Sequence, residues 1–152
     1  RKNNMNVKYL VHLRINGSAL CILPFLLILV FLGARAFSTI FGVGVFVFSD
    51  RGTDVGYVEL VTRGVAYLAV IPVSEELYFR GLVYNSLQNY YRKRSAVILT
   101  SFYFAVGHVS NPPSLMLWFF LKGLVYVGFY EKYKTLAPGI ALHALTNLPI
   151  AV

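Results

Sequence analysis

The stretch SEELYFRG, residues 74–81, combines two carboxylates and a guanidinium within an otherwise apolar part of the chain. Apolar residues lie on both sides of it, so we expect these charges within or beside a membrane span. An ionisable side chain at bilayer depth costs about 3 kcal/mol and is tolerated mainly where it meets a partner or a wet cavity. At helical spacing Glu76 and Arg80 predict an i,i+4 ion pair, and a purely structural pair is one interpretation. One arginine does not neutralise two carboxylates, however, and Glu75 is left needing another partner.

Two further motifs, FAVGH at 104–108 and HALTN at 143–147, place polar side chains in later apolar stretches. His143 and Asn147 are i,i+4 neighbours and project from one face of a helix. Such a pair indicates a common ligand or a hydrogen-bond network between membrane helices. His108 by itself is more typical of a satisfied interfacial histidine than of a catalyst, so its functional interpretation depends on the other motifs.

The composition is that of an integral membrane protein: the 152 residues are 57% hydrophobic and 13% charged, with a mean hydropathy of +0.64. The net charge of +8 does not indicate nucleic-acid binding, because the basic residues are grouped between apolar runs, as in cytoplasmic loops. We therefore expect a multi-pass protein of the plasma or inner membrane, with the lipid bilayer as a partner and no nucleic acid. The single Cys21 excludes an intrachain disulfide and a cysteine metal cluster, and we interpret it as a packing residue.

The hydrophobic pattern predicts an all-α polytopic transmembrane helical bundle of about five spans. Residues 1–16 are basic and are expected to stay in the cytoplasm, along the anionic membrane surface. The first span is expected at Ala19–Ala34, closed by Arg35. The run Ala36–Phe48 is too short for a comfortable crossing, and it either extends the first helix, re-enters the membrane or lies in the interface. Residues 49–56 predict an exposed turn.

The rest of the chain predicts four helices: Tyr57–Tyr91, Ser95–Val109, Leu115–Tyr130 and Leu136–Val152. Pro72 lies near the middle of the first and removes one backbone hydrogen bond, which predicts a bend just before Glu75. We expect one integral-membrane domain over residues 1–152, with the motifs in a core of about 57–152 and an accessory span before it. The chain does not begin with Met, which is compatible with a segment of a longer protein, and nothing in it resembles a cleavable signal.

The three motifs together carry a resemblance that none of them carries alone. Glu-Glu-x-x-x-Arg-Gly, then Phe-x-x-x-His, then His-x-x-x-Asn, in this order on three polar-interrupted helices, resembles the CAAX protease and bacteriocin-processing family, also called the Abi family. These are intramembrane glutamic endopeptidases. The resemblance covers roughly Ala69 to Pro149, and it implies a membrane-anchored peptide or protein as substrate. The short chain is also similar to the sorting-type, myxosortase-like members.

The chemistry of peptide hydrolysis agrees with what the resemblance implies. The reaction needs an activated water and donors for the tetrahedral oxyanion. A carboxylate removed from water is a stronger base, and the resemblance implies that Glu75 with His108 binds and deprotonates the water. His143 and Asn147 are then expected to donate hydrogen bonds to the oxyanion, and Arg80 to hold Glu76.

Three alternatives remain beside the glutamic enzyme. One glutamate and two histidines can ligate zinc; since no His-Glu-x-x-His pair occurs and the family is metal-independent, we expect no metal and no cofactor. A non-catalytic member acting as an immunity or peptide-binding scaffold protein is the second. The third is a transporter subunit with a proton relay, which no inverted repeat supports.

Lys122 departs from the family pattern, because it interrupts Leu115–Tyr130 close to its centre. We expect its long side chain to snorkel toward the membrane interface. The alternative is that Lys122 faces the cavity and pairs with the second carboxylate.

The placement of the charges also predicts the depth of the site. The basic runs 92–94 and 132–134 flank an out-and-back pair of spans and are expected on the cytoplasmic face. Glu75 lies about 25 Å of helix from Arg92, and His108 about 21 Å from Arg94, across a hydrocarbon core of ~30 Å. We therefore expect the motifs to meet in the middle to outer part of the membrane, which favours cleavage at the external side, as in a C-terminal anchor of an exported protein.

Overall fold

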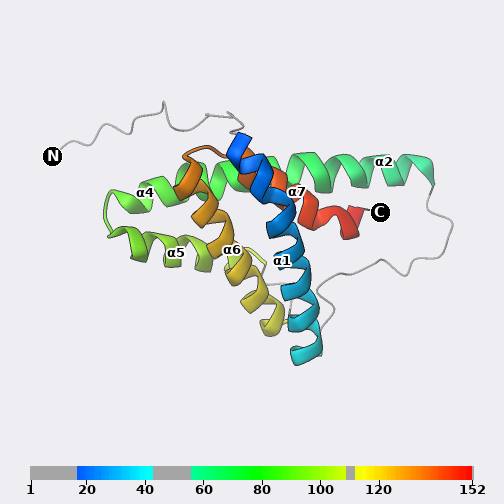
Figure 1. The fold of residues 1–152 in the computed structure, drawn as a ribbon, viewed down its shortest axis with the longest axis horizontal. Helices are drawn as coiled ribbons and strands as arrows, with labels where there is room; N and C mark the ends of the chain where they lie inside the picture. Colours follow the sequence, from blue (N-terminus) through cyan, green and yellow to red (C-terminus); the bar gives the residue numbers. More distant parts are fainter. Residues whose placement is uncertain (1–16, 43–55, 109–111, 152) are drawn as a thin grey trace.

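The computed structural model describes residues 17–42, 56–108 and 112–151, and every regular element within these ranges is helical (Figure 1). The all-α prediction is confirmed. The separate helices are α1 (Gly17–Phe41), α5 (Lys93–Val106), α6 (Pro113–Tyr133) and α7 (Ala137–Ala151). One long helix runs without interruption through α2 (Tyr57–Val65), η2 (Ala66–Val70), α3 (Ile71–Glu76), η3 (Leu77–Tyr84) and α4 (Asn85–Gln88).

Three of these helices are long and apolar enough to cross a bilayer: Cys21–Phe41, Tyr57–Gln88 and Pro113–Tyr133. α5 and α7 have 14 and 15 residues, fewer than the ~20 that a straight crossing needs. With these two, the described part of the chain contains the five helical units that the hydrophobic pattern predicts. The chain is therefore a helical membrane protein.

The helix α1 is longer than expected. We predicted that Arg35 would close it, and this is wrong: the helix continues to Phe41 and ends at Gly42, whose φ of +63° is the left-handed conformation typical of a helix end. Arg35 is exposed, and a single exposed charge does not break a helix. Residues 36–41 thus extend the first helix. Residues 1–16, residues 43–48 and all but the last residue of the predicted turn at 49–56 lie outside the described residues.

The outward face of α1 is apolar, which explains a second error. Phe25, Ile28 and Leu32 are among its exposed side chains, and Cys21 is exposed as well. The interpretation of Cys21 as a packing residue is therefore wrong. Hydrophobic character does not distinguish a lipid-facing position from a core position in a membrane helix.

The sequence predicts a bend caused by Pro72, and the long helix continues through this residue without interruption. Its turns widen instead: residues 66–70 and 77–84 are π-helical, and the Ile71 N–H donates to the carbonyl of Ala66, five residues earlier. In that register the missing N–H of Pro72 leaves the carbonyl of Tyr67 without its backbone partner. Asn147 of α7 supplies a replacement, because its Nδ2 donates to Tyr67 O at 3.2 Å. The proline thus widens the helix and connects it to α7.

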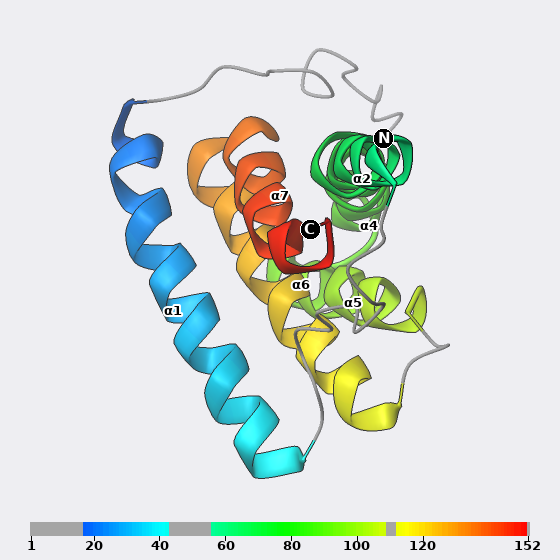
Figure 2. The same cartoon turned by 90° about the vertical axis from the view of Figure 1, so that its right-hand side faces the viewer.

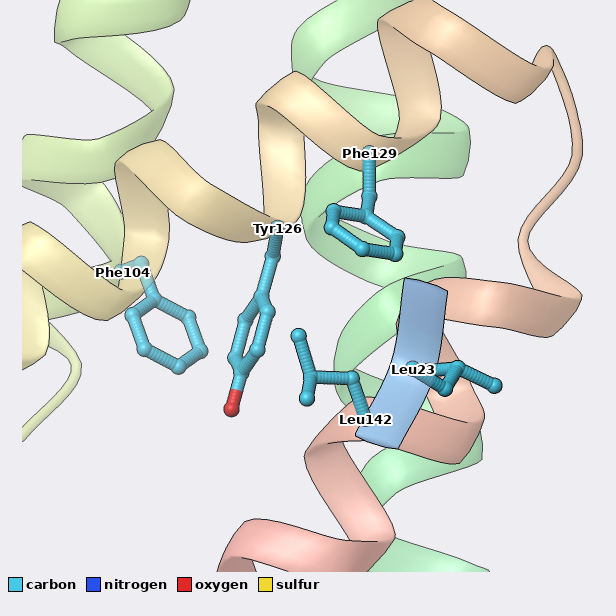
Figure 3. Close-up of a cluster of buried hydrophobic side chains, with 5 residues drawn as sticks. All are labelled: Leu23, Phe104, Tyr126, Phe129 and Leu142. Atoms are coloured by element: carbon cyan, nitrogen blue, oxygen red, sulfur yellow. The ribbon is translucent and has the colours of Figure 1, made fainter. Parts of the chain in front are cut away.

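α6 and α7 occupy the middle of the bundle, between α1 on one side and the long helix on the other (Figure 2). α5 lies beneath α4 and η3 and packs along α6. The main core contains Leu23, Phe104, Tyr126, Phe129 and Leu142, which come from α1, α5, α6 and α7 (Figure 3). This core packs α7 against α1, α5 and α6.

The two basic runs meet at one end of the bundle. Glu131 near the end of α6 forms ion pairs with Lys93 at the start of α5 and with Lys134, and it accepts a hydrogen bond from Gln88 of α4. The ends of α4, α5 and α6 are therefore joined, and Arg92–Arg94 and Lys132–Lys134 lie at the same end, as the charge pattern predicts.

Candidate active site

Glu76 is the fully engaged carboxylate of the pair. It is 1% exposed, and its Oε1 accepts hydrogen bonds from Arg80 Nη1 at 3.0 Å and from His143 Nδ1 at 3.2 Å. Its Oε2 faces Gly139 in the first turn of α7, where a Cβ would lie 3.2 Å from that oxygen. Glu76 thus connects α3 to α7, and it has little room for a further ligand.

Arg80 confirms the predicted i,i+4 ion pair and does more than neutralise Glu76. It is completely buried, and its Nη2 donates to the carbonyl of Gly123 in α6 at 3.3 Å. The guanidinium lies over the rings of Phe104 and Tyr126, at 4.7 and 5.0 Å from their centroids. Cation–π contact of this kind compensates a desolvated arginine. Arg80 therefore fixes α5, α6 and the long helix around Glu76.

Glu75 differs from Glu76 in its exposure and in its hydrogen bonding. Its side chain is 26% exposed, whereas its Oε2 is buried and has no hydrogen-bond partner among the described residues. That oxygen lies 3.8 Å from His143 Nε2, beyond hydrogen-bond distance. Two groups at this separation can both lie about 3 Å from one small ligand atom. Glu75 is the carboxylate with unused hydrogen-bonding capacity.

His143 lies between the two carboxylates. A carboxylate oxygen accepts, so Nδ1 carries the proton toward Glu76, and Nε2 faces Glu75. Tyr126 stacks on the imidazole at 5.0 Å between centroids, and its hydroxyl is hydrogen-bonded to Thr146 Oγ1 at 2.8 Å. Thr146 in turn donates to His143 O. The ring is therefore held in one orientation from both sides.

Sequence reasoning did not identify Tyr126, Thr146 or the two close-approach glycines as parts of the site. Thr146 lies within the HALTN motif and offered a weak signal, one turn after His143. Tyr126 is one of several aromatic residues in an apolar helix and offered none. A Cβ on Gly123 would lie 3.0 Å from Ser101 Cα, and such contacts depend on which helices become neighbours.

Asn147 is buried on the same helix face as His143, but its amide has another partner. Its Nδ2 donates to Tyr67 O in η2, next to the proline that frees this carbonyl. The predicted role as an oxyanion donor stays a prediction. The contact that the structure shows is a helix-to-helix hydrogen bond beside the site.

His108 follows the C-terminal end of α5, one helical turn after Phe104. Its Nδ1 donates to Phe104 O at 2.8 Å, which fixes the tautomer and leaves Nε2 as an acceptor. The ring stacks on Phe119 at 3.9 Å and contacts Phe104, the same ring that His143 contacts from 6.1 Å. The structure thus clusters Glu75, Glu76, Arg80 and His143, with Asn147 and His108 on the two sides. That Glu75 and His108 share one water stays a prediction.

Lys122 is buried in α6, and the snorkelling prediction is wrong. The residue is 9% exposed, and its Nζ lies 5.8 Å from the Phe119 ring and 5.7 Å from the Tyr126 ring. These aromatic neighbours hold the stem inside the bundle, within electrostatic range of Glu75 and Glu76. The structure shows no direct ion pair from Lys122 to either carboxylate in the residues it describes.

No group of three or more histidine, cysteine, aspartate or glutamate side chains within the described ranges has the geometry to hold a metal ion. Glu75 and His143 approach each other, and Glu76 is engaged with Arg80. The donor set therefore does not fit the zinc alternative, and no step is assigned to a metal.

Comparisons with known proteins agree with the order of the motifs. Neither the curated proteins nor the solved structures include a match to this chain. Residues 57–149 match the family described as type II CAAX prenyl endopeptidase Rce1-like. That range is more than half of the chain, and it contains both glutamates, Arg80, both motif histidines and Asn147. The chain therefore belongs to the type II CAAX prenyl endopeptidase Rce1-like family of membrane proteases.

Proposed function

We propose that this protein is an intramembrane glutamic endopeptidase in which Glu75 is the general base. The observation that carries the proposal is that the two glutamates differ in burial and in hydrogen bonding. Glu76 is held by Arg80 and His143, whereas Glu75 is partly exposed and keeps a buried oxygen with no hydrogen bond in the described residues. A general base must reach both water and substrate, and only Glu75 has the access.

In this mechanism Glu75 takes a proton from a water whose oxygen attacks the scissile carbonyl carbon. The carbonyl π electrons move to the oxygen, and the tetrahedral intermediate collapses with transfer of the proton from Glu75 to the leaving nitrogen. His108 supports the base, because its acceptor Nε2 can orient the same water. His143 and Asn147 are the proposed donors to the oxyanion. Because Nδ1 of His143 donates to Glu76, its Nε2 donates only when the ring is the doubly protonated imidazolium. Asn147 must then donate from its second N–H, or release Tyr67.

The proposed substrate is a protein with a C-terminal membrane anchor, cut near the external side of the cell membrane. This follows from the helix that separates the site from the basic end of the bundle. Lys93 and Lys134 mark that end through Glu131, and Glu75 lies several helical turns away from it along the long helix. If the basic end is cytoplasmic, the site opens in the middle to outer part of the membrane.

The test compares membrane peptides by mass spectrometry in cells that express the wild-type protein, Glu75→Ala or Glu75→Gln. We expect cleavage products that disappear in both variants, while binding of the uncleaved substrate to the purified variants persists. A peptide-binding scaffold would show binding without products in all three. Products that persist in both variants would overturn the assignment of Glu75.

A further inference from the structure

Lys122 is the charged group near the site that the mechanism above does not use. It lies in the middle of α6, four residues before Tyr126, whose ring stacks on His143. Four residues is one helical turn, so Lys122 and Tyr126 share a face of α6. On the other side its Nζ lies near Phe119, the ring on which His108 stacks. Lys122 thus lies between the two aromatic rings that support the two histidines.

Of the two glutamates at the site, only Glu76 forms an ion pair with a buried arginine or lysine of the described residues. Arg80 makes its ion pair with Glu76 at 3.0 Å, and His143 completes the hydrogen bonding of the same oxygen. Glu75 Oε2 has no hydrogen-bond partner among the described residues, and Lys122 forms no direct ion pair there with either carboxylate. Both groups border the same pair of rings: Lys122 Nζ lies 5.7 Å from the centroid of Tyr126, Tyr126 stacks on His143, and His143 Nε2 lies 3.8 Å from Glu75 Oε2. A buried ammonium and a carboxylate oxygen without a hydrogen bond in the described ranges therefore border one buried cluster.

We propose that Lys122 is the counter-charge of Glu75, and that its field stabilises the negative charge that this carboxylate carries as a base. The inference rests on the proposed function in naming Glu75 as the base, but the pairing itself does not need it. Coulombic attraction acts over several ångströms inside a protein, where it is screened far less than in water. A counter-charge held at a distance, unlike Arg80 beside Glu76, leaves the carboxylate oxygens open to water and substrate.

The aromatic rings explain why Lys122 stays at that distance. Phe119 and Tyr126 each hold the ammonium by cation–π attraction, at 5.8 and 5.7 Å from their centroids. The other charged or titratable groups around it are Glu76 of α3, Arg80 of η3 and His143 of α7. Arg80 repels the Lys122 ammonium, and Glu76 is already paired with Arg80. Glu75 is therefore the carboxylate whose negative charge Lys122 stabilises.

A double-mutant cycle on protein stability tests the pairing without any substrate. Lys122→Met keeps the length of the stem, Glu75→Gln keeps the shape of the carboxylate, and the double variant removes both charges. We expect Lys122→Met to lower the unfolding midpoint of the protein purified in detergent, and addition of Glu75→Gln to recover part of that loss. Lys132→Met is the matched control, since Lys132 is an exposed lysine of the same helix that also contacts a tyrosine ring.

Two outcomes of the cycle overturn the pairing: midpoint shifts that add, and a double variant that does not fold although Glu75→Gln alone does. The first shows no coupling between the charges. The second shows that folding needs the Lys122 ammonium for a reason other than the charge of Glu75. If Lys122→Met alone does not fold, restored folding in the double variant supports the pair.

Cleavage kinetics test the consequence for the base, using a substrate found in the peptide comparison above. We expect Lys122→Met to lower kcat on the order of 100-fold, the scale of a general base, with a smaller change in KM. Lys122→Arg, which keeps the charge, is expected to recover most of the activity. Wild-type kcat in Lys122→Met, or equal losses in both variants, overturns the role. Absence of cleavage by the wild-type protein contradicts the proposed function, and the stability cycle still decides the pairing.

Discussion

At the scale of single residues, the site consists of two neighbouring glutamates with opposite surroundings. Adjacent residues of a helix point about 100° apart, so Glu76 is directed into the bundle against Arg80 and α7, and Glu75 toward its partly exposed edge. Burial alone would make both carboxylates costly. Arg80 and His143 offset that cost for Glu76, and Glu75 is left available for chemistry.

The ion pair of Glu76 and Arg80 should be essential for stability, because each group is buried. We expect Arg80→Met to destabilise the protein by about 3–5 kcal/mol, since it leaves Glu76 buried without its cation. Chemical unfolding in detergent measures this. Arg35→Met is the control, because Arg35 is exposed on α1; similar losses in the two variants would contradict a special role for the pair.

Activity should not depend on a metal ion if the carboxylate and imidazoles act alone. We expect cleavage to survive exhaustive treatment with a chelator, and the purified protein to contain metal well below one equivalent by elemental analysis. Stoichiometric zinc that is lost with activity and restores it on addition would favour the metal alternative instead.

At the scale of elements, the long helix positions the glutamates through its irregular turns. The π-helical segments on either side of α3 change the direction in which its side chains point. Asn147 then holds α7 at the carbonyl that Pro72 frees. The irregular helix and the contact with α7 therefore depend on each other.

The connection between Pro72 and Asn147 predicts a coupling that stability measurements can detect. Asn147→Leu should cost about 1–3 kcal/mol in the wild-type protein, because it leaves the partly buried Tyr67 O without this hydrogen-bond partner. In a Pro72→Ala background the N–H of residue 72 can donate to that carbonyl, and the same substitution should cost less. Equal costs in the two backgrounds would show that Asn147 does not serve the carbonyl freed by Pro72.

The packing of α6 on α5 makes a second prediction at this scale. A Cβ at Gly123 would lie 3.0 Å from Ser101 Cα, and the carbonyl of Gly123 accepts from Arg80. We expect Gly123→Ala to separate the helices and to cost about 1–3 kcal/mol. Gly128→Ala on the same helix meets nothing within 4 Å and should be neutral, or stabilising by up to about 1 kcal/mol. Equal effects of the two substitutions in chemical unfolding would contradict the close packing.

At the scale of the whole molecule, the basic end of the bundle and the site lie apart along the helices. Glu131 forms ion pairs with Lys93 and Lys134 at one end of the bundle, where α4 ends and α5 begins. α5 leads away from this end and α6 returns to it (Figure 1). Which side of the membrane this basic end faces decides from which side a substrate enters.

Single cysteines in a Cys21→Ser background test that orientation. Ser95 lies near the start of α5 and Ser114 near the start of α6, at opposite ends of the helix pair. In intact cells we expect a membrane-impermeant thiol reagent to label Ser114→Cys, and to label Ser95→Cys only after the membrane is opened. The reverse pattern would place the basic end outside and move the proposed cleavage to the cytoplasmic side.

The sequence by itself determined the helical membrane class, the ion pair of Glu76 with Arg80 and the family, because these depend on composition, on helical spacing and on the order of local motifs. The tertiary structure decided what depends on neighbours distant in the chain. Cys21 faces outward and Lys122 inward, although both lie in apolar helices, because the packing of α6 and α7 between α1 and the long helix selects the buried faces. His143 pairs with Glu76, and Asn147 with Tyr67, across 67 and 80 residues of sequence. Spacing along a helix fixes which side chains share a face, but only packing fixes what that face meets.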